Sequence, residues 1–346
     1  MDVREFDFSL PPELIAQEPA AERGAARLLH LRRDAGVSVH TSIRSLPDLL
    51  HEGDLIVVNN TRVFPARLLG RRVPTGGAVE CLLIGRVGED RWEALMHPGQ
   101  KLRPGAEVIF EGARALHGVV LERRFFGRRV LRLWTEGGDV DEVVDAIGHV
   151  PLPPYIKRED RPEDRERYQT VFATERGSIA APTAGLHFSS DLVAALERRG
   201  IERVEITLHV GYGTFQPVRV EHVEDHRLEP EAYEIDEAAA ARINRAIDEH
   251  RRVVAVGTTT TRTLEAVARQ HDGRIAAGGG ITDLFIFPGF QFRVVQCLLT
   301  NFHLPRSTLL MLVCAFGGYE RVMAAYAEAV AERYRFYSYG DAMLIS

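Results

Sequence analysis

Two short phrases in the second half of the chain place a histidine beside small, turn-forming residues. They are IAAPTAGLHF, which contains His187, and LHVGYGTFQPV, which contains His209. Core packing does not require this combination, whereas imidazoles and hydroxyls next to glycines can bind a ligand or move a proton. A third phrase, LLTNFHLPRSTLLMLVCAF, places Asn301 and His303 before a long apolar run. Together the three phrases predict a binding or catalytic site.

Glycines in the first two phrases are expected to let the backbone adopt a positive φ or approach a ligand closely. They are Gly185, Gly211 and Gly213. Neighbouring hydroxyl and aromatic side chains complete the predicted ligand-binding set, which adds Thr183, Phe188, Tyr212, Thr214 and Phe215.

The phrase VAVGTTTTRTLE indicates a buried strand, a glycine turn and the start of a helix. Free N–H groups at a helix N-terminus can hold a carboxylate or a phosphate, and Arg262 could complete the charge. Ordinary N-capping by threonine explains the same pattern equally well. The predicted binding residues here are Thr258, Thr259, Arg262 and Glu265. The phrase lacks the lysine of a P-loop and the GxGxxG of a dinucleotide site.

Two single acids, Asp283 and Asp341, lie beside strand-like apolar segments, including LFIFPG. Each carboxylate could act as an acid, a base or a ligand anchor, and each could equally be a cap or turn residue. His222 and His226 have the i, i+4 spacing of a helical metal site. Because HExxH and paired cysteines are absent and the other histidines do not follow zinc spacing, we predict no metal site.

Composition indicates a globular protein of two compact units, with 346 residues of which 45% are apolar. The net charge of -6 gives no overall signal for nucleic acid, although arginine-rich local patches remain possible. The apolar runs are too short to cross a bilayer, and the N-terminus lacks a basic segment followed by an apolar one. We therefore expect a cytoplasmic protein with no membrane contact.

The pattern of strands and helices predicts an α/β domain interrupted by a smaller β domain. From about Leu68 to Gly148, short alternating runs are separated by turn residues every 8 to 12 positions, which is typical of a small antiparallel barrel or sandwich. Elsewhere strands alternate with helices, expected at 189–200, 236–252 and 319–336 and in the second half of 253–270. We predict a mixed or mostly parallel sheet built from residues 1–66 and 149–346, with an inserted β-barrel domain at 67–148.

Ten phrases, in order from end to end, make the chain resemble the S-adenosylmethionine:tRNA ribosyltransferase-isomerase family of the queuosine pathway. They are FDFSLPPELIAQEPA, GDLIVVNNTRVFPARLLG, IGHVPLPPYI, YQTVFA, AAPTAGLHF, TLHVGYGTFQPV, VAVGTTTTRTLE, TDLFIFPG, LLTNFHLPRSTLLMLVCAF and YRFYSYGDAMLI. One such phrase is weak evidence, whereas the ordered series is highly specific. The sequence departs from the family pattern at Ala26, Leu228, Glu229 and Gln296, so no essential role is expected for those side chains.

The resemblance implies transfer of the ribosyl part of S-adenosylmethionine to 7-aminomethyl-7-deazaguanine at the tRNA wobble position. The products are epoxyqueuosine in tRNA, adenine and methionine. The sulfonium acidifies the 5′ carbon, so a base can form an ylide; adenine then leaves, the tRNA amine bonds to the sugar, and methionine departs as an epoxide closes. S-adenosylmethionine is thus a consumed substrate, with tRNA as the partner, no metal or cofactor, and a monomer expected.

This chemistry needs proton transfer and a pocket that tolerates a cation. The candidates for proton transfer are His187, His209, Asp283 and Asp341. Phe188, Tyr212 or Phe215 could face the sulfonium, and Arg262 with the threonine-rich helix start could take the methionine carboxylate or a tRNA phosphate.

Two other functions remain alternatives. An S-adenosylmethionine-dependent RNA methyltransferase normally shows a glycine-rich turn after an early strand and an acid ending the next strand, and the chain has no such pair. A non-catalytic tRNA-binding protein is favoured by the arginine-rich stretch RRFFGRRVLRLW, although an exposed hairpin with solvated charges explains that stretch more simply.

Overall fold

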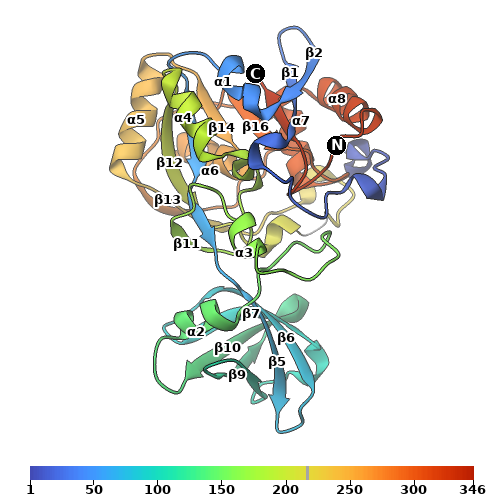
Figure 1. Ribbon diagram of the computed structural model, residues 1–346, viewed down its shortest axis with the longest axis vertical. Helices are drawn as coiled ribbons and strands as arrows, with labels where there is room; N and C mark the ends of the chain where they lie inside the picture. The colour runs from blue at the N-terminus through green and yellow to red at the C-terminus, as the bar shows by residue number, and fades with distance from the viewer. Residues whose placement is uncertain (216–217) are drawn as a thin grey trace.

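A computed structural model of the chain describes residues 1–215 and 218–346, without the side chains of Thr214 and Phe215. The predicted binding roles of those two side chains therefore lie outside what the structure describes. Figure 1 shows a larger α/β part that carries both termini and a smaller β part, joined by a narrow connection. In that connection β4 (Thr61–Val63) pairs in parallel with β11 (Glu175–Ser178).

A nine-stranded sheet forms the centre of the larger part, among the described residues, in the order β15-β13-β12-β3-β14-β16-β17-β1-β2. Four neighbouring strands, β12, β3, β14 and β16, are parallel, while β17 runs antiparallel to β16 and parallel to β1. The strands are β1 Arg27–Arg32, β2 Val37–Ser42, β3 Leu55–Asn59, β12 Glu202–Leu208, β13 Glu231–Ile235, β14 Val253–Val256, β15 Gly278–Thr282, β16 Cys297–Asn301 and β17 Ala342–Ile345. The predicted mixed sheet is confirmed.

Helices cover both faces of this sheet because its central strands are buried on both sides. One face packs against α5 (Glu237–Asp248), α6 (Thr258–Gln270), α7 (Thr308–Gly317) and α8 (Tyr319–Ala331). The other packs against α1 (Leu46–Leu49) and α4 (Ser190–Arg198). The capped helix expected at 189–200 is confirmed, since the Ser189 hydroxyl accepts a hydrogen bond from the Leu192 N–H at 3.2 Å. A single turn, α3 (Asp164–Arg167), follows the smaller part.

The smaller part is a closed antiparallel barrel of six strands, in the order β10-β7-β6-β5-β8-β9 within the described residues. Its strands are β5 Arg67–Val73, β6 Ala78–Arg86, β7 Arg91–His97, β8 Glu107–Phe110, β9 Leu116–Arg123 and β10 Arg128–Thr135, and α2 (Val140–Ile147) packs against it. An α/β domain with an inserted small barrel is therefore confirmed as the fold class. We propose 67–148 as the bounds of the insert, which the paired backbones of Arg67 and His149, its entry and exit, support.

One local expectation was wrong. The phrase LFIFPG, which was expected to be strand-like, forms no strand. The strand in this region is instead the glycine-rich β15, which precedes it. The ladder ends where Thr282 pairs with Glu231, because the residue before Glu231 is Pro230, which has no N–H to donate. His222 and His226 flank one short turn, Val223–Asp225, so they do not share a helix face.

No single helix within the described residues is both long and apolar enough to cross a membrane. The helices α7 and α8 reach that length and composition only as a pair bent by 117°.

Candidate active site

The predicted site residues come from segments that meet at one edge of the sheet. The parallel strands β3, β12, β14 and β16 all end there, so the residues after them, including Gly257 and Asn301, lie at this edge. Because β17 runs in the opposite direction, the segment 335–341 that precedes it reaches the same edge, as does the segment before β1. Crevices beyond the carboxyl ends of parallel strands are the usual ligand sites of such sheets.

A pocket at this edge, called here the central pocket, opens to solvent. Five of the predicted binding residues line it, namely Thr183, Thr258, Thr259, Asn301 and His303. The other lining residues are Tyr155, Ala180, Ala181, Pro182, Ala184, Val210, Gly257, Thr300, Leu309, Tyr337 and Ser338.

Helix α6 begins at the wall of the central pocket. Its N-cap is Gly257, whose φ of 91° suits glycine, and no side chain caps the helix. Thr260 and Thr261 donate their hydroxyls to the carbonyls of Val256 and Gly257, at 2.8 and 3.1 Å, so they do not act as caps. The Thr259 hydroxyl is buried without a hydrogen-bond partner among the described residues. N-capping by threonine is therefore not the reason for this sequence, and the helix start is suited to bind an anion.

Asn301 and His187 form a buried polar pair beside the pocket. The Asn301 amide nitrogen lies 3.2 Å from His187 Nε2 and donates to the Tyr337 carbonyl at 3.0 Å. An amide that donates to both requires Nε2 to be the acceptor, which assigns the His187 proton to Nδ1. Burial, with smaller effects of Arg335 and Arg23, lowers the pKa of His187 to about 4. His187 is therefore neutral near pH 7, and the buried Asn301 Oδ1 has no partner among the described residues.

His303 is the second neutral imidazole at the pocket. Its Nε2 shares a hydrogen bond of 2.9 Å with the Thr300 hydroxyl, and its backbone N–H donates to the Tyr326 hydroxyl at 3.1 Å. Burial lowers its pKa to about 3. No group of three or more His, Cys, Asp or Glu in the described part of the chain could hold a metal ion. The lining of the central pocket thus carries no ionised side chain at neutral pH.

Tyr155, Tyr337 and Ser338 are among the lining residues that sequence reasoning missed. The two tyrosine rings meet edge to face, and the Tyr155 hydroxyl bonds the Ser338 hydroxyl. Tyr337 has a φ of 76°, which is rare for a residue with a side chain and is concentrated at functional sites. The signal was present in the phrases LPPYI and YRFYSYGD, which carry these aromatics beside proline and glycine.

His209 does not line the central pocket, although its neighbour Val210 does. Successive residues alternate sides at the end of an extended strand, so only one of the two can face the pocket. The His209 ring instead lies over Gly177, and its Nδ1 shares a hydrogen bond of 2.8 Å with the Thr61 hydroxyl. Burial lowers its pKa, opposed by Glu175 and Glu234.

The side chains of Arg262 and Glu265, both on α6, are held by other groups of the protein. Arg262 is buried, donates to Glu231 at 2.7 Å and to the Leu284 carbonyl at 3.0 Å. Glu265 is fully buried, and its carboxylate accepts the N–H groups of residues 293–295 at 2.8 to 3.0 Å. The Arg262 guanidinium and the Glu265 carboxylate thus each bind other buried groups of the protein. Neither residue lines the central pocket.

The two candidate acids also lie outside the central pocket. Asp283 is exposed just after β15. Asp341 is buried, and its two oxygens accept the backbone N–H groups of Arg27 and Arg335 at 2.9 and 2.8 Å. Asp341 therefore ties the segment before β1 to the segment before β17, which is a positional role.

The remaining predicted residues have packing roles. None of the three glycines has a positive φ, so the first of their two expected roles does not apply. A Cβ at Gly185 would lie 2.8 Å from Thr170, and one at Gly213 would lie 2.9 Å from Glu229, so close packing explains both. The Gly211 N–H donates to Glu231 at 2.9 Å. Phe188 is in the core against Phe172, so it cannot face a sulfonium, and Tyr212 lines the cleft between the barrel and the α/β part.

Comparison with known proteins gives one consistent result. Residues 3–345 match the family model described as "Queuosine biosynthesis protein". Two relatives named S-adenosylmethionine:tRNA ribosyltransferase-isomerase are 51% identical (Heliobacterium modesticaldum) and 52% identical (Anaeromyxobacter sp.), covering all of this chain and 100% and 99% of theirs. The crystal structure of an S-adenosylmethionine tRNA ribosyltransferase from Thermotoga maritima is 39% identical, covers 99% of this chain and 100% of its own, and has a TM-score of 0.56. On these findings, and with the ordered series of phrases, the chain belongs to the queuosine biosynthesis protein family.

Proposed function

We propose that this chain transfers and isomerises the ribosyl part of S-adenosylmethionine onto 7-aminomethyl-7-deazaguanine at the tRNA wobble position. The products are epoxyqueuosine in tRNA, adenine and methionine. Membership of the family and the names of full-length relatives support this activity. S-adenosylmethionine is consumed as a substrate, and the reaction needs no metal or further cofactor. We further propose a monomer that acts in the cytoplasm.

The observation that carries the proposal is the composition of the central pocket. S-adenosylmethionine has a carboxylate, an ammonium and a sulfonium, so it is a net cation that a basic pocket would repel. The uncharged lining avoids this repulsion, and the uncapped start of α6 at Gly257 can take the carboxylate. The faces of Tyr155 and Tyr337 are suited to the sulfonium. Two buried polar atoms that have no hydrogen-bond partner among the described residues, Asn301 Oδ1 and Thr259 Oγ1, are available to fix the orientation of the ligand.

His187 is the proton-transfer group of this proposal. A base must be unprotonated to act, and the low pKa of His187 keeps its ring neutral near pH 7. Its hydrogen bond with Asn301 holds the ring orientation, and Nε2 must release this bond to the Asn301 amide when it accepts the proton, while Nδ1 keeps its own proton. Removal of a proton from the 5′ carbon forms the ylide, cleavage of the glycosidic bond releases adenine, the amine of the tRNA base bonds to the sugar, and methionine leaves as the epoxide closes. His187 does not itself line the central pocket, but it is hydrogen-bonded to Asn301, which does. His209, Asp283 and Asp341 have no side-chain hydrogen bond to a lining residue within the described part of the chain, so no step is given to them.

Adenine release from S-adenosylmethionine, measured with and without tRNA carrying the aminomethyl-deazaguanine base, tests the proposal. Release that depends on this tRNA, together with an added ribosyl mass on the RNA, is the expected result. Formation of S-adenosylhomocysteine with a methyl group on the RNA would identify a methyltransferase instead. Binding of tRNA without consumption of S-adenosylmethionine would identify a non-catalytic binding protein.

A further inference from the structure

A second pocket lies beside the central pocket and is lined by three arginines. It shares Ser338 with the central pocket, and His187 forms part of its wall. Its arginines are Arg23 from the segment before β1, Arg167 from the end of α3, and Arg335 from the segment before β17. We call it the arginine pocket. These three residues are 144 and 168 positions apart in the chain, and only the fold brings them together.

The positive charge of the arginine pocket is poorly neutralised. Arg23 donates to the carbonyls of Leu186 and Glu166 at 3.3 and 3.0 Å, and Arg167 donates to backbone carbonyls of residues 20 and 21. Carbonyls orient a guanidinium without cancelling its charge. Neither Arg23 nor Arg167 has a carboxylate within 4 Å in the described part of the chain, and the nearest for Arg335 is Asp341 at 3.9 Å.

Electrostatics around Arg23 support a net positive field. Burial lowers the pKa of Arg23, and the nearby charge of Arg167 lowers it further, while Glu166 acts in the opposite direction. Arg335 and Arg23 likewise contribute to the lowered pKa of His187, after burial. Two cations held close together in a half-buried pocket stabilise an anion placed between them.

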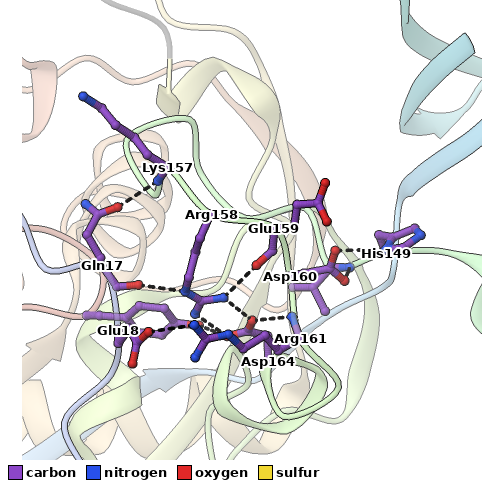
Figure 2. A network of polar contacts seen from close by, with 11 residues as sticks. Gln17, Glu18, His149, Lys157, Arg158, Glu159, Asp160, Arg161 and Asp164 are labelled. Atoms are coloured by element: carbon purple, nitrogen blue, oxygen red, sulfur yellow. Dashed lines mark hydrogen bonds and ion pairs between the residues drawn. The ribbon is translucent and has the colours of Figure 1, made fainter.

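Two nearby acids, Asp164 and Glu18, are engaged by other arginines, as Figure 2 shows. Arg158 holds Asp164 through two hydrogen bonds of 2.6 and 2.9 Å, and Arg161 pairs with Glu18 at 3.0 Å. Arg158 also donates to the Gln17 carbonyl at 3.1 Å. This network fixes α3, which carries Arg167, against the N-terminal segment that carries Arg23. It therefore assembles the arginine pocket without neutralising it.

We propose that the arginine pocket binds a backbone phosphodiester of the tRNA, next to the nucleotide that reacts in the central pocket. This inference rests on the proposed function, which supplies tRNA as the partner. S-adenosylmethionine carries two positive groups and one carboxylate, so three guanidiniums disfavour it, whereas they match a polyanion. Ser338 lines both pockets, and His187 of the arginine pocket is hydrogen-bonded to Asn301 of the central pocket, so a phosphodiester bound here lies beside the bound S-adenosylmethionine.

Arg335→Gln is the sharpest test because Arg335 makes the weakest contacts of the three. Its side chain is 37% exposed, and its contacts are 3.5 Å to the Glu18 carbonyl and 3.9 Å to Asp341, so removal of its charge disturbs the fold least. The measurement is the dissociation constant for tRNA carrying the aminomethyl-deazaguanine base, across a series of salt concentrations. We expect affinity to fall roughly tenfold, and the slope of log affinity against log salt to become shallower by about 0.7 to 1.

Three controls make the result specific. Arg198→Gln removes an exposed arginine of α4 that has no ion pair among the described residues, and it should keep wild-type affinity and slope. Arg335→Lys retains the charge and should retain most of the slope. Arg23→Gln should reproduce the shallower slope, which keeps the test independent of the folding of one variant. Thermal unfolding of each variant verifies the fold.

An unchanged tRNA affinity and slope in both Arg335→Gln and Arg23→Gln would overturn the inference. A raised KM for S-adenosylmethionine with unchanged tRNA binding would also overturn it, because the methionine carboxylate would then be the occupant. Failure of the proposed function is distinguishable, since the wild-type chain would then release no adenine whatever the variants bind. Adenine release by the wild type, with wild-type tRNA binding by both variants, would refute the arginine pocket alone.

Discussion

Replacement of His187 by glutamine should make the protein less sensitive to acid and should abolish its activity. In an unfolded chain a histidine has a pKa of about 6.5. In the folded chain burial lowers the pKa of His187 to about 4. The unfolded chain therefore binds a proton more readily, so the stability that the neutral ring contributes is present above about pH 6.5 and is lost as the pH falls towards 4.

The size of this loss follows from the two pKa values. Between pH 7 and pH 4.5, protonation of the unfolded chain at His187 lowers the free energy of unfolding by about 2–3 kcal/mol. Glutamine cannot be protonated, so the His187→Gln variant should lose about 2–3 kcal/mol less than the wild type over this interval. His303, whose pKa burial lowers to about 3, contributes equally in both proteins and cancels.

Urea unfolding followed by circular dichroism at pH 7 and pH 4.5 measures the difference. His271→Gln is the matched control because the side chain of His271 is exposed, and this variant should lose as much stability as the wild type. Adenine release by His187→Gln at pH 7 should fall by at least about 100-fold, as expected for loss of a proton-transfer group. If His187→Gln and the wild type lose the same free energy of unfolding between pH 7 and pH 4.5, the burial argument is refuted. Full activity of His187→Gln would remove His187 from the mechanism.

Three further variants test residues that the structure places outside the central pocket. Glu265→Gln removes the charge that binds three backbone N–H groups and should lower the free energy of unfolding by about 2–4 kcal/mol. The KM for S-adenosylmethionine should stay unchanged. A raised KM at full stability would instead indicate that Glu265 binds the ligand. Glu231→Gln leaves the buried Arg262 without its carboxylate and should cost about 3–5 kcal/mol in urea unfolding, so a neutral result would argue against a buried pair. Gly177→Ala places a Cβ 2.6 to 2.8 Å from the His209 ring and should lower the free energy of unfolding by about 1–3 kcal/mol. The His209 ring resonances in the NMR spectrum should shift, and unchanged resonances would contradict this packing.

Local patterns in the sequence were sufficient for the elements and for the fold class. The buried strands, the capped helix after Ser189 and the alternating runs of the barrel each depend on residues close together in the chain, so period and turn chemistry indicate them. The ordered series of phrases was sufficient for the family. Residues of the threonine-rich turn and of the TNFH phrase line the same pocket, because the carboxyl ends of parallel strands meet at one edge of a sheet.

Which side chain of each phrase faces the pocket was decided only by the tertiary structure. Val210 lines the pocket and His209 does not, because the alternation of an extended segment depends on how β12 is paired. Glu265 was expected to bind a ligand, but its carboxylate binds N–H groups 28 to 30 residues further along the chain.

The arginine pocket shows the same limit most clearly. Its residues, Arg23, Arg167 and Arg335, are ordinary arginines in three unrelated segments, and no local pattern marks them. A sequence determines periodicity, turns and family because these are properties of neighbouring residues. The convergence of charges at a site depends on strand order, on register and on which carboxylates are already paired, and these exist only once the chain has folded.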